Sequence, residues 1–201
     1  MNAERPVLPF GAAAPGRRRL LAAGALAWLG VPTRARGNGI GPVIPPLAAP
    51  ALPLRRHDGS RAALSTQLSG APTVVQLMFT GCSTICSIQG ALFAALQAAL
   101  VAQRQPPTRL LSLSIDPLAD DPAALSAWLR RFGAGPAWSA AAPAPAALEP
   151  MLSLFRGGVA AGDRHTGQVY VFDRDARLVW RTSELPAQTE VMAALRRLGP
   201  A

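Results

Sequence analysis

"APTVVQLMFTGCSTICSIQG", residues 71–90, joins an unbroken apolar segment to the two cysteines of the chain, Cys82 and Cys86. Residues 71–80 are apolar and β-branched without a periodic polar face, which is typical of a strand buried on both sides. From residue 86 to 103, Ile88, Leu92 and later leucines recur every four residues and predict a helix with one apolar stripe. We therefore expect both thiols at the C-terminal end of a central strand, in the first turn of a helix.

The segments that follow predict alternating strands and helices. Asp121 before Pro122 predicts the start of a helix, because Asp caps helices and Pro favours the first helical position. An Ala/Pro-rich loop is expected around Trp138. The other expected elements are a strand over 108–116, a helix ending before Gly133, a short helix over 148–155, a hairpin over 167–182 and a last helix over 186–198. This order predicts an α/β, thioredoxin-like fold, a central mixed sheet flanked by helices.

The N-terminal residues have the composition of an export signal. Arg17, Arg18 and Arg19 precede an apolar stretch over 20–31, which is the length of a signal-peptide core and short for a membrane span. We expect residues 1–35 to be a signal peptide or an N-terminal membrane anchor, 36–50 to be a Pro/Gly-rich linker, and 51–201 to be the folded domain. The sequence leaves the export route open, twin-arginine or general. The domain is then expected in the periplasm or at the extracytoplasmic face of the inner membrane, where thiols tend to be oxidised unless they are kept reduced or bind metal.

The net charge of +9 does not indicate nucleic-acid binding. Five of the twenty Arg precede residue 36, and the others are scattered among acidic residues without interleaved aromatic side chains. We expect no nucleic-acid partner.

The spacing of Cys82 and Cys86 is compatible with a disulfide, a redox couple or a metal site. Residues four apart on a helix lie over one another, about 6 Å apart along the axis. This separation suits a disulfide and also allows two thiolates to bind one soft metal ion. A disulfide closing so short a loop would stabilise the fold little.

A third ligand would favour metal. His165, in "GDRHTGQVYVF", directly precedes an expected strand, although by itself it is typical of a surface loop. His57 lies in a polar turn and is expected to be solvated. Two thiolates and one imidazole suit Cu(I), whereas structural zinc normally has a fourth protein ligand. Met78 and Met151 are expected to pack in the core, and Asp120-Asp121 to cap a helix.

Three segments resemble, in order, the three signatures of the Sco/SenC family. They are "FTGCSTIC", "LSIDPLADDPAALSAWLRRF" and "RHTGQVYVFDRDARLV", and the similarity covers residues 50–198. The family comprises thioredoxin-fold copper proteins that assist metallation of cytochrome c oxidase. The resemblance implies that Cys82, Cys86 and His165 are copper ligands. It also matches Asp116-Pro117 and Trp138 to family positions.

The sequence departs from the family pattern around the thiols. The family usually has Pro after each Cys and an acidic residue between them, whereas this chain has Ser83, Ser87 and Thr84 at those positions. A missing Pro loosens the turn, and a missing carboxylate removes a negative charge beside the metal.

The resemblance implies an exported copper-binding metallochaperone that holds one copper ion, as Cu(I) and/or Cu(II), through two Cys and one His. Its expected partner is a cytochrome c oxidase subunit or another copper acceptor. An alternative is a thiol:disulfide oxidoreductase that uses Cys82 and Cys86 with a thiol reductant partner. A thiol peroxidase would need an Arg beside the reactive Cys, which the sequence does not place there. A non-catalytic interaction module is the remaining alternative.

Overall fold

The computed structural model describes residues 39–102, 107–156 and 166–199. The expected signal or anchor over 1–35 and the candidate ligand His165 lie outside the described residues. The described elements are β1 (Gly41–Ala48), β2 (Pro53–Arg56), β3 (Arg61–Ala63), α1 (Leu64–Leu68), β4 (Thr73–Met78), α2 (Ile85–Ala102), β5 (Arg109–Ser114), α3 (Pro122–Arg131), β6 (Trp138–Pro143), the 3-10 helix η1 (Pro145–Ala147), α4 (Leu148–Arg156), β7 (Val169–Phe172), β8 (Arg177–Arg181) and α5 (Gln188–Arg196).

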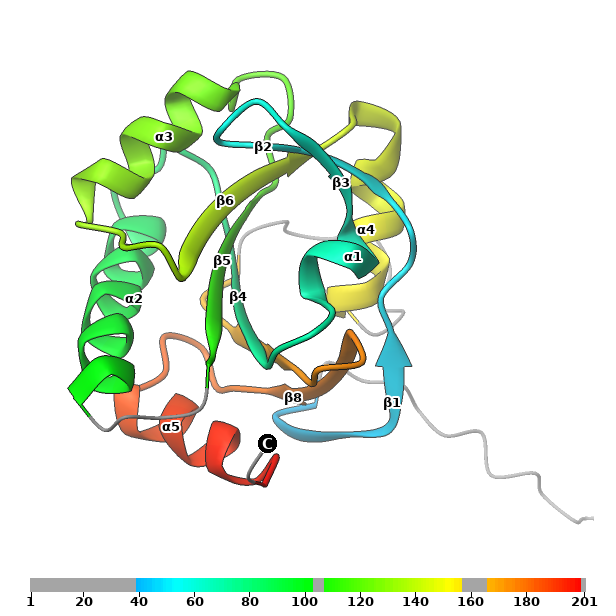
Figure 1. Ribbon diagram of the computed structural model, residues 1–201, viewed down its shortest axis with the longest axis vertical. Helices are drawn as coiled ribbons and strands as arrows, with labels where there is room; N and C mark the ends of the chain where they lie inside the picture. Colours follow the sequence, from blue (N-terminus) through cyan, green and yellow to red (C-terminus); the bar gives the residue numbers. More distant parts are fainter. Residues whose placement is uncertain (1–38, 103–106, 157–165, 200–201) are drawn as a thin grey trace, which may run out of the picture. The chain divides into compact units, whose positions relative to one another are not determined.

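The strands form one mixed sheet in the order β1-β8-β7-β4-β5-β6-β2-β3. At its centre β4 and β5 run parallel, β5 and β6 run parallel, and β7 pairs antiparallel with β4. Helices cover both faces (Figure 1). The expected thioredoxin-like fold, a mixed sheet flanked by helices, is confirmed.

Alternate residues of β4 contact the two helical layers, as a strand buried on both faces requires. Val75 and Leu77 belong to the apolar cluster that includes α1 and α4, whereas Val74 and Met78 belong to the cluster that includes α2, α3 and α5. All six residues of β4 are buried. The cysteine-bearing segment therefore follows a strand that is buried along its whole length.

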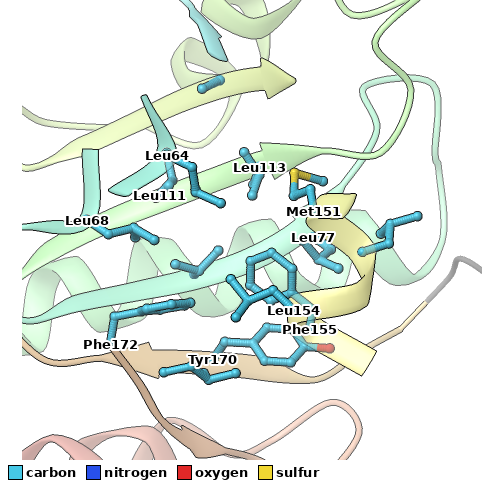
Figure 2. Packing of buried hydrophobic residues seen from close by; sticks show 14 of the residues in the cluster. Leu64, Leu68, Leu77, Leu111, Leu113, Met151, Leu154, Phe155, Tyr170 and Phe172 are labelled. Atoms are coloured by element: carbon cyan, nitrogen blue, oxygen red, sulfur yellow. The ribbon is translucent and has the colours of Figure 1, made fainter. Parts of the chain in front are cut away.

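The cluster on the α1 and α4 side is built around aromatic rings (Figure 2). The Phe155 ring of α4 packs edge-on against Tyr170 of β7, with 4.7 Å between ring centroids, and against Phe172 at 6.0 Å. Leu64 and Leu68 of α1 are also fully buried there. This layer holds the sheet from the side opposite α2.

Trp138 lies in a strand, not in the expected loop. It begins β6, which pairs parallel with β5, Leu110 opposite Trp138, and antiparallel with β2. The strand is rich in Ala, whose low strand propensity hid it in the sequence. Backbone pairing on both sides makes it a strand nevertheless, and it extends the sheet beyond β5.

Part of the expected linker over 36–50 is also a strand. Residues 41–48 form β1, which pairs antiparallel with β8, and Val43 of this strand is only 8% exposed. The prolines that suggested a linker are compatible with an edge strand, where a missing N–H leaves no gap in the ladder. The folded part of the chain thus begins before residue 51.

Helix α2 buries part of the expected stripe: Leu96 and the neighbouring Phe93 are 0% exposed, whereas Leu92 and Leu100 are only partly buried. Its buried residues include Cys86, Gln89, Gly90 and Phe93, whereas Ile88 is 55% exposed. Among the described residues, α2 alone is long and apolar enough to cross a membrane. Because it carries Cys86 and packs against the sheet through Phe93, it is a core helix of the domain.

Candidate functional site

Cys82 and Cys86 lie at the C-terminal end of β4, as expected. After Met78 the chain turns, and the Cys82 N–H donates to the Phe79 carbonyl at 3.2 Å. Helix α2 begins at Ile85, so Cys86 occupies its first turn. Both cysteines are free thiols, 8% and 4% exposed. In open sheets with parallel strands this edge is where ligands bind, because the loops there leave room and helix N-termini point to it.

The surroundings of Cys82 favour ionisation of its thiol. Burial opposes its ionisation, but hydrogen bonds from the backbone N–H groups of Cys86 and Thr84, and from both side chains, stabilise the thiolate. The Thr84 hydroxyl lies 3.7 Å from the Cys82 sulfur. Together these donors lower the pKa of Cys82 to about 7. A substantial fraction of Cys82 is thiolate at neutral pH, and the thiolate is the nucleophile and the metal ligand.

The surroundings of Cys86 instead favour the protonated thiol. Burial raises its pKa to about 12, and the neighbouring Cys82 acts in the same direction, both as a hydrogen-bond partner and through its charge. Cys86 therefore keeps its proton at neutral pH and donates a hydrogen bond toward Cys82. One reactive thiolate beside one protonated thiol suits a redox couple and also a metal site that is completed when the second proton leaves.

Ser87 of α2 links the loop over residues 80–84, which we call the cysteine loop, to helix α3 through two hydrogen bonds. Its hydroxyl donates to the Cys82 carbonyl at 3.3 Å and accepts from Nη2 of Arg131 at 3.4 Å. Arg131 ends α3 and lies over the Phe132 ring, 5.4 Å from its centroid. The sequence did not place an arginine here, because residues 87 and 131 are distant along the chain. Ser87 itself was noticed only as a departure from the family pattern.

Asp120 and Asp121 have different roles, which corrects the expectation that both cap a helix. Asp121 caps α3, accepting from the Ala124 N–H at 2.8 Å. Asp120 is instead buried, 1% exposed, and accepts hydrogen bonds from Thr80 and Ser114. Nothing in the local sequence separates one Asp from the other, since the distinction depends on a contact 40 residues away.

The described residues just after His165 bond to residues 182–184, and Gln168 also bonds to α2. The Thr166 hydroxyl donates to Glu184 at 3.0 Å, and the Gln168 side chain donates to the Thr182 carbonyl at 2.9 Å. The Gln168 carbonyl accepts at 3.2 Å from Gln89, which follows Cys86 by three residues on α2. Gln89 was missed in the sequence because a single Gln in an apolar helix resembles a surface residue.

Within residues 39–102, 107–156 and 166–199, no group of three His, Cys, Asp or Glu side chains could hold a metal ion. His57 is not fully solvated, contrary to expectation, because its Nδ1 lies 3.2 Å from the Ala140 carbonyl of β6. It borders a pocket of about 720 Å³ that neither cysteine lines. Met78 and Met151 are fully buried in the two apolar clusters, as expected.

The sequence profile of the family described as SCO1/SenC matches residues 53–199. The chain belongs to the SCO1/SenC family. The match includes both cysteines, Asp120, Ser87 and His165, so the SCO1/SenC assignment covers every residue discussed at the site. No curated protein sequence matches the chain significantly.

Solved structures of SCO1/SenC proteins have the same fold. A SCO1/SenC family lipoprotein from Bacillus anthracis str. Ames has 22% identity and a TM-score of 0.63, covering 77% of this chain and 97% of its own. ScoI of Bradyrhizobium japonicum, solved with copper bound, has 23% identity and a TM-score of 0.60, covering 75% of this chain and 99% of its own. Yeast Sco1, also solved with copper bound, has 16% identity and a TM-score of 0.63, covering 76% and 88%.

Proposed function

We propose that this chain is an exported metallochaperone that binds one copper ion through Cys82, Cys86 and His165 and delivers it to a copper acceptor, such as the copper site of cytochrome c oxidase. The observation that carries the proposal is the thiol pair at the sheet edge, within a chain that belongs to the SCO1/SenC family. The copper-bound structures of Bradyrhizobium japonicum ScoI and yeast Sco1 support it.

The donor set fits copper as the cargo. Thiolate and imidazole ligands suit copper, and two soft thiolates favour Cu(I) in particular. Cys82 is poised to offer its thiolate, because its pKa is lowered to about 7. Cys86 must lose its proton on binding, because burial raises its pKa to about 12. Copper uptake is therefore expected to release about one proton from Cys86 and to strengthen as the pH rises.

The third ligand is proposed to be His165. The support from the described residues is that Gln168 lies against α2, since its carbonyl accepts from Gln89 at 3.2 Å. Cys86 lies on the same helix, three residues before Gln89. His165 precedes Gln168 by three residues in the sequence.

Copper stoichiometry and affinity test the proposal. The reduced full chain is expected to retain about one copper ion per chain under anaerobic conditions. Cys82→Ala and Cys86→Ala should each weaken copper binding strongly, because a thiolate ligand is lost. His165→Ala should weaken binding by a smaller factor. Competition with a chromophoric Cu(I) chelator measures all four proteins.

His57→Ala is the matched control, because His57 is the other histidine of the chain and borders a pocket that neither cysteine lines. It should bind copper as the unsubstituted chain does. Failure of the unsubstituted chain to retain copper would refute the metallochaperone function. Equal affinity of the His165→Ala and His57→Ala variants would remove His165 from the ligand set.

The difference in pKa between Cys82 and Cys86 favours a second candidate function, that of a thiol:disulfide oxidoreductase. The Cys82 thiolate attacks a partner disulfide, forming a mixed disulfide and releasing one partner thiolate. Cys86 then loses its proton and attacks the Cys82 sulfur, which releases the second partner thiolate and leaves a Cys82–Cys86 disulfide. Two electrons pass to the partner, and an external dithiol reductant must restore the chain.

Trapping of mixed disulfides tests the oxidoreductase function. A Cys86→Ser variant should accumulate mixed disulfides with extracytoplasmic proteins, because Cys82 can attack but nothing resolves the intermediate. Cys82→Ser is the matched control and should trap far less, since Cys86 is protonated at neutral pH. The complexes are detected as reducible bands on non-reducing gels. Equal trapping by the two variants would contradict the assigned order of attack.

The proposed location is the periplasm or the extracytoplasmic face of the inner membrane, with residues 1–35 as signal peptide or anchor. In that compartment the thiols require a reductant partner before they can bind copper. The two candidate functions are therefore compatible, because both need the reduced Cys82–Cys86 pair.

A further inference from the structure

The buried carboxylate of Asp120 binds the residue that begins the cysteine loop. The Thr80 N–H lies 3.2 Å from each carboxylate oxygen, the Thr80 hydroxyl donates to Oδ1 at 2.6 Å, and the Ser114 hydroxyl donates to Oδ2 at 2.7 Å. No cation forms an ion pair with Asp120 in the part of the chain that the structure describes. Charge-assisted hydrogen bonds to an enclosed carboxylate are among the stronger ones in proteins.

These contacts stand where backbone pairing between β4 and β5 ends. Met78 lies opposite Ser114, and the Ile115 N–H donates to the Met78 carbonyl at 2.8 Å. In a parallel ladder the next β4 amide that faces β5 is that of Thr80. The Asp120 carboxylate receives this amide instead of a backbone carbonyl. The chain can therefore leave the sheet at Thr80 and still be held to β5.

The cysteine loop is thus fixed at two points. Asp120 holds it at Thr80, two residues before Cys82, and Ser87 holds it at the Cys82 carbonyl. The loop that carries Asp120 is itself closed, since the Asp120 N–H donates to the Asp116 carbonyl at 2.9 Å and the Asp116 N–H donates to the Ser114 hydroxyl at 2.9 Å. Together these bonds restrict movement of the Cys82 backbone relative to Cys86.

We propose that Asp120 is a positioning residue that, through Thr80, holds the Cys82 sulfur against Cys86. The inference deepens the proposed function, on which it rests, because copper binding and disulfide chemistry both require the two sulfurs in one place. Asp120 acts through Thr80 and touches neither sulfur. Its effect is to raise the effective concentration of one thiol at the other, as holding two reacting groups in place does.

The equilibrium between the thiol pair and glutathione measures that effect without copper. In this exchange, the chain dithiol and one oxidised glutathione give the chain disulfide and two reduced glutathiones. We expect Asp120→Asn, which keeps the shape and removes the charge, to lower the equilibrium constant of the full chain about tenfold, the factor that freeing about one backbone residue would cause. Thr80→Val, which removes only the hydroxyl donor, should lower it in the same direction, and Thr80→Ser should retain the value of the unsubstituted chain.

Asp121→Ala is the matched control for a merely structural effect. Asp121 is the adjacent carboxylate and caps α3 without contacting Thr80. Its loss should lower the melting temperature, because a helix cap is removed, and leave the glutathione equilibrium constant unchanged. Unchanged or higher equilibrium constants for Asp120→Asn and Thr80→Val would overturn the proposal. If Asp120→Asn does not fold, Thr80→Val alone decides, and the copper-retention result stands separately in either case.

Discussion

Ser87 and Thr84 show how this chain organises a cysteine loop without the prolines and the acidic residue that the family pattern has there. The Ser87 hydroxyl donates to the Cys82 carbonyl, and the Thr84 hydroxyl lies 3.7 Å from the Cys82 sulfur. Proline restricts a turn by fixing one dihedral, whereas these hydroxyls restrict it by hydrogen bonds. The same two residues that depart from the pattern therefore supply contacts of their own to Cys82.

The Cys82 contacts predict a selective reaction with alkylating agents. In the reduced chain, iodoacetamide should modify Cys82 before Cys86, and the rate should rise with pH through a midpoint of about 7, where Cys82 ionises. The sign follows from the lowered pKa, because thiolate replaces thiol above the midpoint. Thr84→Val removes one of the hydrogen bonds that stabilise the thiolate and should move the midpoint to higher pH. Peptide mass spectrometry after timed quenching measures both rates.

Cys82→Ser provides the control, because it leaves Cys86 as the single thiol. Burial raises the pKa of Cys86 to about 12, so this variant should react slowly throughout the neutral range. Faster modification of Cys86 than of Cys82 in the unsubstituted chain would contradict the assignment of the two thiols.

At the scale of elements, the sequence predicts the helices and strands whose sequence signals lie within a few adjacent residues. The apolar run of β4 and the Asp121-Pro122 start of α3 were both predicted, because burial on two faces and helix capping are visible in a few adjacent residues. Both cysteines were placed correctly at the end of β4 for the same reason. The expected thioredoxin-like order followed from these elements.

Elements and contacts that depend on distant partners were not predictable in this way. β6 is a strand because β5 and β2 pair with it, not because Ala favours strands. Gly90 lets the Phe132 ring approach α2 closely, since a Cβ there would come within 2.4 Å of that ring. Arg131 reaches Ser87 through the same close approach of α2 and the end of α3. Asp120 reaches Thr80 from the loop between β5 and α3 in the same way.

At the scale of the whole domain, the site depends on the sheet that supports it. β4, which leads to the cysteines, is buried on both faces, and β7 beside it follows the residues anchored to α2 by Gln89. β8 pairs with β7, and β1 completes that side of the sheet by pairing with β8. Two strands, β8 and β7, separate β1 from β4, so a change at the β1 edge should lower the free energy of unfolding before it affects the thiols.

A stability measurement can decide whether residues 41–48 belong to the folded domain as an edge strand or act as a linker. A chain beginning at residue 49 lacks β1. Its free energy of unfolding should be about 2 kcal/mol lower than that of a chain beginning at residue 39, because burial of an aliphatic side chain such as Val43 contributes about that much. In the longer chain, Val43→Ala should be destabilising, whereas Ile44→Ala, at a side chain 76% exposed, should be nearly neutral. Urea unfolding followed by tryptophan fluorescence measures all four proteins under reducing conditions. Equal stabilities of the two truncated chains would mean that residues 41–48 act as the linker that their prolines suggested, because a linker contributes no packing to the core.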